Sequence, residues 1–151
     1  MRTYDELIAA YAADHQNPTN QRLHKVCVPL IMFSLLGLLW ALPSPELFRR
    51  VAGLNWATLV VALALYYYFF VDRLSFFVML VQSTLMLTGI AGLAAKGPLV
   101  PVCAVIFALA WVGQFVGHSI EGKRPSFLRD LQFLLIGPLW THAGWLERFR
   151  R

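Results

Sequence analysis

The sequence is poor in charged residues. Asp, Glu, Lys and Arg together make up 14% of the 151 residues, whereas hydrophobic residues make up 58%. Ordinary soluble domains have about 25% charged and roughly 45–50% apolar residues. Because a soluble chain of this length cannot bury so much apolar surface, lipid is the expected solvent. The net charge of +5 is then expected to reflect the orientation of the chain in a membrane. The sequence has no basic stripe with interleaved aromatic residues, the pattern that would predict nucleic-acid binding.

Cysteine and the common catalytic motifs are also scarce. Cys27 and Cys103 each lie inside an apolar run, so we expect small buried residues rather than a disulfide or a thiolate metal site. GxSxG, HExxH and GxxxxGK[ST] do not occur, so no motif indicates a serine hydrolase, a zincin or a P-loop enzyme. The first residues include Asp5, Glu6 and Asp14 and lack an uninterrupted apolar core, so we expect no signal peptide.

Long apolar stretches dominate the rest of the chain. They cover residues 26–42, 54–71, 74–95 and 98–117. A transmembrane helix needs about 20 apolar residues, and the short links between these stretches favour antiparallel neighbours. We therefore predict an all-α fold: a single transmembrane domain, 1–151, whose four spans form an integral membrane four-helix bundle.

Two flanking segments differ from the spans. Residues 3–14 predict an amphipathic helix in which Thr3 and Glu6 form a capping box. Its apolar stripe consists of Tyr4, Leu7, Ile8 and Tyr11. This helix could lie on the membrane surface. The C-terminal segment, 131–151, has a short apolar run broken by Gly137-Pro138. That segment predicts an interfacial or re-entrant helix.

The basic residues indicate an orientation. With four spans, both termini and the 72–73 turn share one side of the membrane. That side holds ten of the thirteen Lys and Arg residues: Arg2, Arg22, Lys25, Arg73, Lys123, Arg124, Arg129, Arg148, Arg150 and Arg151. The positive-inside rule therefore places both termini in the cytoplasm. The short loops favour a multi-pass protein of the bacterial inner membrane.

Four histidines flank the apolar stretches. His15 and His24 precede the first, His118 ends the fourth, and His142 lies in the C-terminal segment, so all four share the predicted cytoplasmic side. Gln114, His118 and Glu121 are spaced by about one helical turn and share a face. Polar groups on such a face usually contact protein or a water-filled pocket.

These residue types suit two readings. A few imidazoles and one carboxylate can hold a divalent metal and leave positions open for substrate and O₂. Alternatively, the histidines cap helix ends at the interface. Glu121 could be a metal ligand, a hydrogen-bonding partner of His118, or a solvated side chain. Four histidines cannot supply the roughly eight that membrane di-iron desaturases use, and their positions fit a bis-histidine haem poorly.

The basic residues beside the histidines also have two readings. Lys123 and Arg124 could bind phospholipid headgroups, or they could hold the carboxylate of a fatty acid whose tail runs between the helices. Arg22, near His24, is a further candidate for that carboxylate.

Two segments carry a resemblance to a known family. DHQNPTNQRLHKVCVPL (14–30) and WVGQFVGHSIEGKRPSFLRDLQFLLIGPLW (111–140) resemble the 2-hydroxy fatty acid dioxygenase family. This family includes a fungal endoplasmic-reticulum protein of fatty acid α-oxidation and bacterial membrane proteins. The resemblance covers nearly the whole chain and the order of its spans. Its paired signature is H-x₈-H before the first span and GQFxGH followed by an acidic residue after the last.

The resemblance implies an oxygenase that depends on ferrous iron, Fe(2+). It would use O₂ to shorten a 2-hydroxy fatty acid by one carbon and release CO₂. It implies His15, His24 and His118 as iron ligands and Glu121 as a catalytic residue, either a ligand or a partner of one. His142 is included as a fourth candidate ligand only because it is predicted to lie on the same side of the membrane as the other three histidines. Gln114, with the basic residues named above, completes the expected substrate-binding set.

Two other functions remain open. One is a non-catalytic membrane protein that binds lipid or assists assembly, and the other is a zinc-dependent lipid hydrolase. The expected partners are the 2-hydroxy fatty acid, O₂ and the lipid bilayer, with no nucleic acid, and an oligomer is left open.

Overall fold

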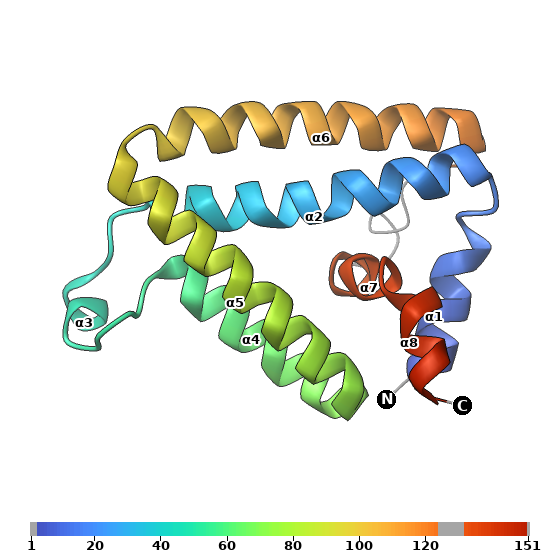
Figure 1. The fold of residues 1–151 in the computed structure, drawn as a ribbon, viewed down its shortest axis with the longest axis horizontal. Coiled ribbons are helices and arrows are strands. Elements are labelled where there is room, and N and C mark those ends of the chain that lie inside the picture. The colour runs from blue at the N-terminus through green and yellow to red at the C-terminus, as the bar shows by residue number, and fades with distance from the viewer. Residues whose placement is uncertain (1–2, 124–131, 151) are drawn as a thin grey trace. The chain divides into compact units, whose positions relative to one another are not determined.

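The computed structural model describes residues 3–123 and 132–150, and every regular element in that part of the chain is a helix (Figure 1). The predicted all-α class is therefore confirmed. In chain order the helices are α1 (Tyr4–Ala13), α2 (Pro18–Trp40), α3 (Glu46–Arg49), α4 (Trp56–Val71), α5 (Arg73–Lys96), α6 (Leu99–Glu121), α7 (Phe133–Trp140) and α8 (Ala143–Arg150).

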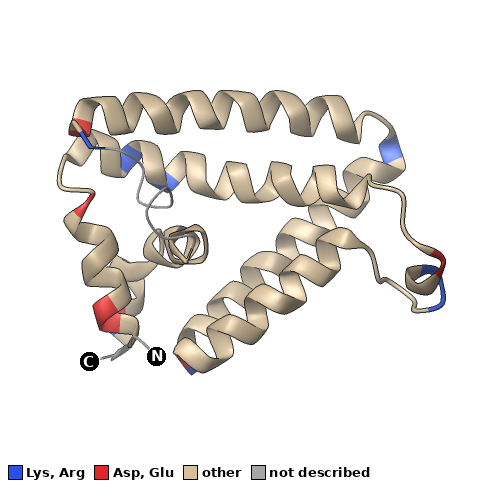
Figure 2. Cartoon of the chain, turned by 180° about the vertical axis from the view of Figure 1, so that it is seen from behind, with Lys and Arg blue, Asp and Glu red and all other residues tan. Residues whose placement is uncertain are grey.

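Three of these helices are long and apolar enough to cross a bilayer, which indicates a membrane protein. Helices α2, α5 and α6 have 23, 24 and 23 residues, or about 35 Å at 1.5 Å per residue. Helix α4 is also apolar but has 16 residues, about 24 Å. Charged side chains lie at the ends of these four helices and in the links between them (Figure 2). The four-helix bundle stays a prediction.

The chain divides into two compact units. One comprises Met1–Ile31 with Ala108–Arg151, and the other comprises Met32–Phe107. Helices α2 and α6 run through both units, so each unit contains a part of each of these helices. The prediction of a single transmembrane domain over 1–151 stays a prediction.

The unit Met32–Phe107 contains the hairpin of α4 and α5 (Figure 1). Its turn is a single residue, Asp72, which ends α4 and caps α5 by accepting hydrogen bonds from Ser75 N at 2.7 Å and Ser75 Oγ at 2.8 Å. A side-chain cap satisfies backbone donors that a helix start leaves open. The core of this unit is built from Leu36, Ala57, Val61, Ile90, Leu99 and Cys103.

Helices α2 and α6 approach closely where glycine on one faces a larger side chain on the other. A Cβ added at Gly37 would collide with Cys103 Sγ, and one added at Gly113 would collide with Cys27 Sγ. A Cβ at Gly117 would collide with Asn20 Oδ1. Both cysteines are free and buried, which confirms the expectation of small buried residues. These contacts set the antiparallel register of the two helices.

Helix α1 has the predicted capping box: Glu6 N donates to Thr3 Oγ1, and Thr3 N donates to Glu6 Oε2. Its predicted apolar stripe is buried inside the protein, with Leu7 fully inaccessible. Helix α1 packs against α7, and a Cβ added at Gly137 of α7 would lie 3.0 Å from Tyr11 Oη. The suggestion that this stripe rests on the membrane surface is therefore wrong, because protein already covers it.

The C-terminal segment breaks at a different place from the one predicted. Pro138 lies inside α7, and the helix continues to Trp140. Pro138 lacks the N–H that would bond to the carbonyl of Leu134, and the helix ends two residues later. The chain turns instead at Thr141 and His142 before α8 begins. The interfacial or re-entrant role of this segment stays a prediction.

The close approach of α2 and α6 predicts that Gly37→Ala destabilises the protein. Forcing a methyl group against Cys103 Sγ should cost about 1–3 kcal/mol, lowering the midpoint of thermal unfolding in detergent. The matched control is Gly92→Ala in α5, where an added Cβ meets nothing within 4 Å; that change should be neutral or stabilising by up to about 1 kcal/mol.

The double variant Gly37→Ala/Cys103→Ala should recover much of the loss, because it removes the sulfur atom that the new methyl group meets. Equal unfolding midpoints for Gly37→Ala and Gly92→Ala would contradict the close approach.

Candidate metal centre

Three of the four histidines come together in the unit Met1–Ile31 with Ala108–Arg151. His15 lies in the link between α1 and α2, His24 lies in α2, and His118 lies in the last turn of α6. Each exposes 6% or less of its surface. One ring nitrogen from each lies within 4.8 Å of the other two, an arrangement able to hold a metal ion.

Helix α2 begins earlier than its apolar stretch, and this places His24 inside the helix. Asn17 Oδ1 accepts a hydrogen bond from Thr19 N at 2.9 Å, and Pro18 is the first helical residue. Asn before Pro is a common helix start, because Asn satisfies a free backbone N–H and Pro has none to lose. His24 precedes the apolar stretch 26–42 in the sequence, but it lies inside the helix that contains this stretch.

The hydrogen bonds of His15 and His24 determine which ring nitrogens carry protons. His15 Nδ1 lies 2.7 Å from Tyr11 O, and His24 Nδ1 lies 3.1 Å from Asn20 O, in each case one helical turn earlier. A carbonyl oxygen only accepts hydrogen bonds, so both Nδ1 atoms must donate. In the neutral rings, both Nε2 atoms then carry lone pairs.

These two lone-pair nitrogens face each other. His15 Nε2 and His24 Nε2 are 3.0 Å apart, and two unshared lone pairs at that distance repel unless a cation lies between or beside them. The third ring has a free nitrogen too: His118 Nδ1 is buried and has no hydrogen-bond partner among the described residues. The three rings also contact one another edge to face, with centroids 4.3–5.2 Å apart.

The donor set fits a divalent transition metal. Imidazole bonds to such metals are about 2.0–2.1 Å long, so two nitrogens bound at a right angle lie about 2.8–3.0 Å apart. The distance between His15 Nε2 and His24 Nε2 matches that value. Neutral imidazole is a ligand for Fe, Zn, Cu and Ni, so the donor atoms alone do not distinguish these metals.

Aromatic rings from α1 and α7 enclose His15. The Tyr11 ring is stacked on it, with centroids 4.3 Å apart and planes at 11°, and Trp140 lies 5.5 Å away. Burial lowers the pKa of the His15 imidazole below its usual value, opposed by the Tyr11 carbonyl, Asp14 and Glu121. Burial also raises the pKa of the Tyr11 hydroxyl. His15 is therefore held in the neutral form that binds metal.

Glu121 lies beside the cluster but is not one of the grouped ligands. Its carboxylate accepts three hydrogen bonds: Oε1 accepts from Gln16 N at 2.9 Å, and Oε2 accepts from Asn17 N at 2.9 Å and from Asn20 Nδ2 at 3.0 Å. In this arrangement Glu121 holds the segment that follows His15. Its predicted catalytic role stays a prediction.

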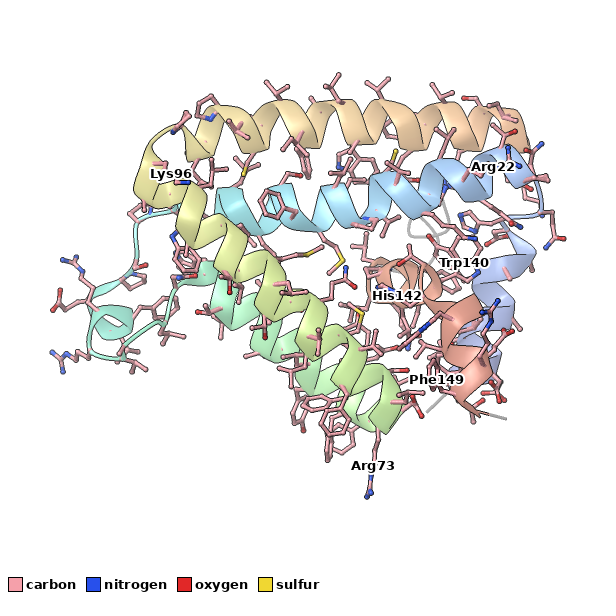
Figure 3. The ribbon with its side chains drawn as sticks, in the orientation of Figure 1. Arg22, Arg73, Lys96, Trp140, His142 and Phe149 are labelled. Carbon is pink, nitrogen blue, oxygen red and sulfur yellow. The ribbon has the colours of Figure 1, made fainter. Side chains whose placement is uncertain are left out.

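His142 does not join the other histidines. It is partly buried at the turn between α7 and α8, where burial lowers its pKa, and it is not part of the group able to hold a metal. Trp140 is the last residue of α7, and His142 follows it in the turn before α8 (Figure 3). The Trp140 ring contacts His15. Its role as a fourth ligand stays a prediction.

The predicted substrate-binding residues occupy different settings. Gln114 is buried one turn before His118, and Arg22 is exposed on α2 (Figure 3). Lys123 Nζ donates to Ala13 O at 2.9 Å, at the C-terminal end of α1, where a cation is favourable. Arg124 lies outside the described residues.

Reasoning from the sequence missed the residues that support the ligands. Tyr11 was assigned only to an apolar stripe, and Asn20 and Trp140 were not considered. A usable signal existed for two of them, since Tyr11 and Asn20 each lie four residues before a clustered histidine. That spacing puts a helical carbonyl within reach of the histidine's Nδ1. Trp140 had no such local signal.

Comparison with protein families settles the relationship of the chain. The family model described as "2-hydroxy-palmitic acid dioxygenase Mpo1-like" matches residues 1–149. The chain belongs to this family. The comparisons with curated proteins and with solved structures gave no match. The predicted family is thus confirmed over nearly the whole chain, and its description names a dioxygenase of a 2-hydroxy fatty acid.

The grouping of three histidines predicts that His24→Ala and His118→Ala lose bound metal, whereas His142→Ala keeps it. Wild-type protein purified in detergent and supplied anaerobically with Fe(II) should retain about one ion per chain, because three neutral imidazoles converge. Elemental analysis of the four proteins measures this.

His142→Ala is the matched control, since it removes a partly buried imidazole from the same unit. Loss of metal from His142→Ala while the protein stays folded would restore His142 to the ligand set.

Proposed function

We propose that this protein is an Fe(II)-dependent dioxygenase that shortens 2-hydroxy fatty acids by one carbon with O₂ and releases CO₂. The observation that carries the proposal is the pair of Nε2 lone pairs of His15 and His24 facing each other at 3.0 Å, with a ring nitrogen of His118 within 4.8 Å. Membership of a family described by a 2-hydroxy-palmitic acid dioxygenase supplies the substrate class.

The reaction balances without a further reductant. A 2-hydroxy acid RCH(OH)COOH and O₂ give RCOOH, CO₂ and H₂O: the bond between C1 and C2 breaks, C2 becomes the new carboxyl carbon, and O₂ takes up four electrons. The substrate provides all four electrons. When bound, Fe(II) would supply open coordination positions for the substrate's carboxylate and hydroxyl oxygens and the redox chemistry that activates O₂.

The protein's own contribution is to position the metal and keep water out. His15, His24 and His118 would be the ligands, leaving up to three positions of a six-coordinate ion for substrate and O₂. The Tyr11 ring stacks on His15 and the Trp140 ring lies 5.5 Å from it, which limits access of water to the histidines.

The fatty acid would lie with its carboxylate at the histidines and its tail along the apolar helices. Gln114, buried one turn from His118, is a candidate to bond the carboxylate or hydroxyl group. Arg22 has an exposed guanidinium on the same helix as His24 and can pair with a carboxylate in two-point geometry. Lys123 is engaged with Ala13 O and would have to leave it to bind substrate.

The cluster also supports four membrane crossings. The His24 end of α2 and the His118 end of α6 must lie on one side of the membrane, because their rings are in contact. The chain between these helices therefore crosses an even number of times. If α5 spans the bilayer, α4 spans it too. The excess of Lys and Arg then places the site and both termini on the cytoplasmic side, as in a bacterial inner-membrane protein.

Activity with 2-hydroxypalmitate is the direct test. Iron-loaded wild-type protein in detergent should consume O₂ and produce CO₂ and the fatty acid shorter by one carbon in equal amounts, measured with an oxygen electrode and mass spectrometry. Palmitate, which lacks the 2-hydroxyl group, is the control substrate and should give no product, because it can chelate the metal only through its carboxylate.

His118→Ala should reduce the rate by more than the roughly 10–100-fold that loss of a ligand's hydrogen-bonding partner costs. Stoichiometric zinc with anaerobic lipid hydrolysis would favour the hydrolase instead. A protein that retains no metal after anaerobic addition of Fe(II) would favour the non-catalytic lipid-binding role.

A further inference from the structure

Of the three clustered histidines, His15 is the one outside a helix. His24 and His118 lie in α2 and α6, whose approach is fixed by close contacts such as that of Gly117 with Asn20. His15 lies in the link that joins α1 to α2, which spans residues 14–17. Its position relative to the other two rings therefore depends on what holds this link.

The C-terminal end of α6 holds the link from both sides of His15. Glu121 accepts hydrogen bonds from Gln16 N and Asn17 N, each at 2.9 Å, directly after His15. Lys123 Nζ donates to Ala13 O at 2.9 Å, two residues before it. These contacts connect positions more than one hundred residues apart in sequence.

The same carboxylate also ties the link to α2. Glu121 Oε2 accepts from Asn20 Nδ2 at 3.0 Å, and the backbone carbonyl of Asn20 accepts the hydrogen bond of His24 Nδ1. Gln21 Nε2 adds a bond to His15 O at 2.8 Å. One side chain thus connects the segment that carries His15 with the residue that orients His24.

These bonds leave little of the Glu121 carboxylate free for a metal. An ionised carboxylate offers about four lone-pair sites, and three are in use. If Glu121 turned to a metal, the backbone N–H groups of Gln16 and Asn17 would lose the acceptor that the structure gives them, at a helix start where backbone donors have no intrahelical partner. The geometry favours Glu121 as an anchor over Glu121 as a ligand.

We propose that Glu121 is a positioning residue that sets metal affinity by fixing the His15 segment on α6, with Lys123 as its partner on the other side of His15. This inference rests on the proposed function in one respect only, that the three histidines bind a metal. It reassigns the acidic residue of the GQFVGHSIE segment from chemistry at the metal to construction of the site.

The experiment is a Co(II) titration of detergent-purified, metal-free protein, followed by visible absorption, for wild type, Glu121→Gln and Glu121→Asp. Glu121→Gln places an amide N–H group against one of the three donors, so the Co(II) dissociation constant should rise about 10–100-fold. The absorption spectrum at saturating Co(II) should match that of wild type, because the three imidazole ligands are unchanged. Glu121→Asp keeps the charge and should recover part of the affinity.

Hydrogen exchange gives a second readout that needs no metal. The backbone amides of Gln16 and Asn17 should exchange faster in metal-free Glu121→Gln than in wild type, since their acceptor is lost. The matched control is Glu147→Gln, which neutralises an exposed carboxylate in α8 and should change neither the Co(II) affinity nor these exchange rates.

The outcomes separate this inference from the proposed function. Wild-type protein that binds neither Co(II) nor Fe(II) would overturn the metal site itself. Co(II) binding by Glu121→Gln with wild-type affinity would overturn the positioning role, and an altered spectrum at saturation would make Glu121 a ligand instead. If Glu121→Gln does not fold, Lys123→Met tests the same link: weaker Co(II) binding with an unchanged spectrum supports the inference, and unchanged affinity overturns it.

Discussion

The site depends on two imidazole nitrogens that cannot remain as they are without a cation. His15 Nε2 and His24 Nε2 are 3.0 Å apart, and each ring donates its Nδ1 proton to a backbone carbonyl one turn earlier. If either ring reversed its protonation, its buried Nδ1 would hold an unpaired lone pair against a carbonyl oxygen. A proton or a metal ion must relieve the repulsion, and burial disfavours the proton. His118 adds a ring nitrogen within 4.8 Å of the other two, a third donor that a metal could use.

The surrounding structure can be understood as support for that arrangement. Glycines at the contact of α2 and α6 let the two helices approach until Gly117 meets Asn20, one turn from His24. Helix α1 is fixed by its packing on α7, which brings the Tyr11 ring onto His15. Glu121 then closes the link between α1 and α2. Hydrogen bonds that orient a ligand and raise its basicity are as much a part of a metal site as the ligand itself.

A site at the end of two membrane helices also suits an amphipathic substrate. A fatty acid has a charged end that favours the interface and a tail that favours hydrocarbon. His118 in the last turn of α6 and His24 near the start of α2 lie at the ends of the long apolar helices. The apolar middle sections of the long helices, which carry no charged side chains (Figure 2), are compatible with the tail. This placement follows from helix length and from where the polar residues stop.

The sequence by itself determined the local properties of the protein. The four long apolar helices, α1 with its capping box and the membrane-like composition follow from hydropathy and from spacings of three and four residues, which depend only on neighbours along the chain. The short helix α3 and the division of the C-terminal segment into α7 and α8 were not predicted. The start of α2 was misplaced because hydropathy does not register a polar first turn, although Asn17-Pro18 marks it. Family resemblance singled out His15, His24 and His118, but spacing alone could not separate them from His142.

Only the tertiary structure decided which of these residues meet. The antiparallel register of α2 and α6 brings His24 to His118, and the contact of Glu121 with Gln16 joins positions separated by 105 residues. The tertiary structure also buries the apolar stripe of α1, which periodicity alone would equally place on a lipid surface. It leaves His142 outside the cluster of three histidines. Such contacts depend on side-chain volume and hydrogen-bonding geometry across space, and no pattern along a single chain records them.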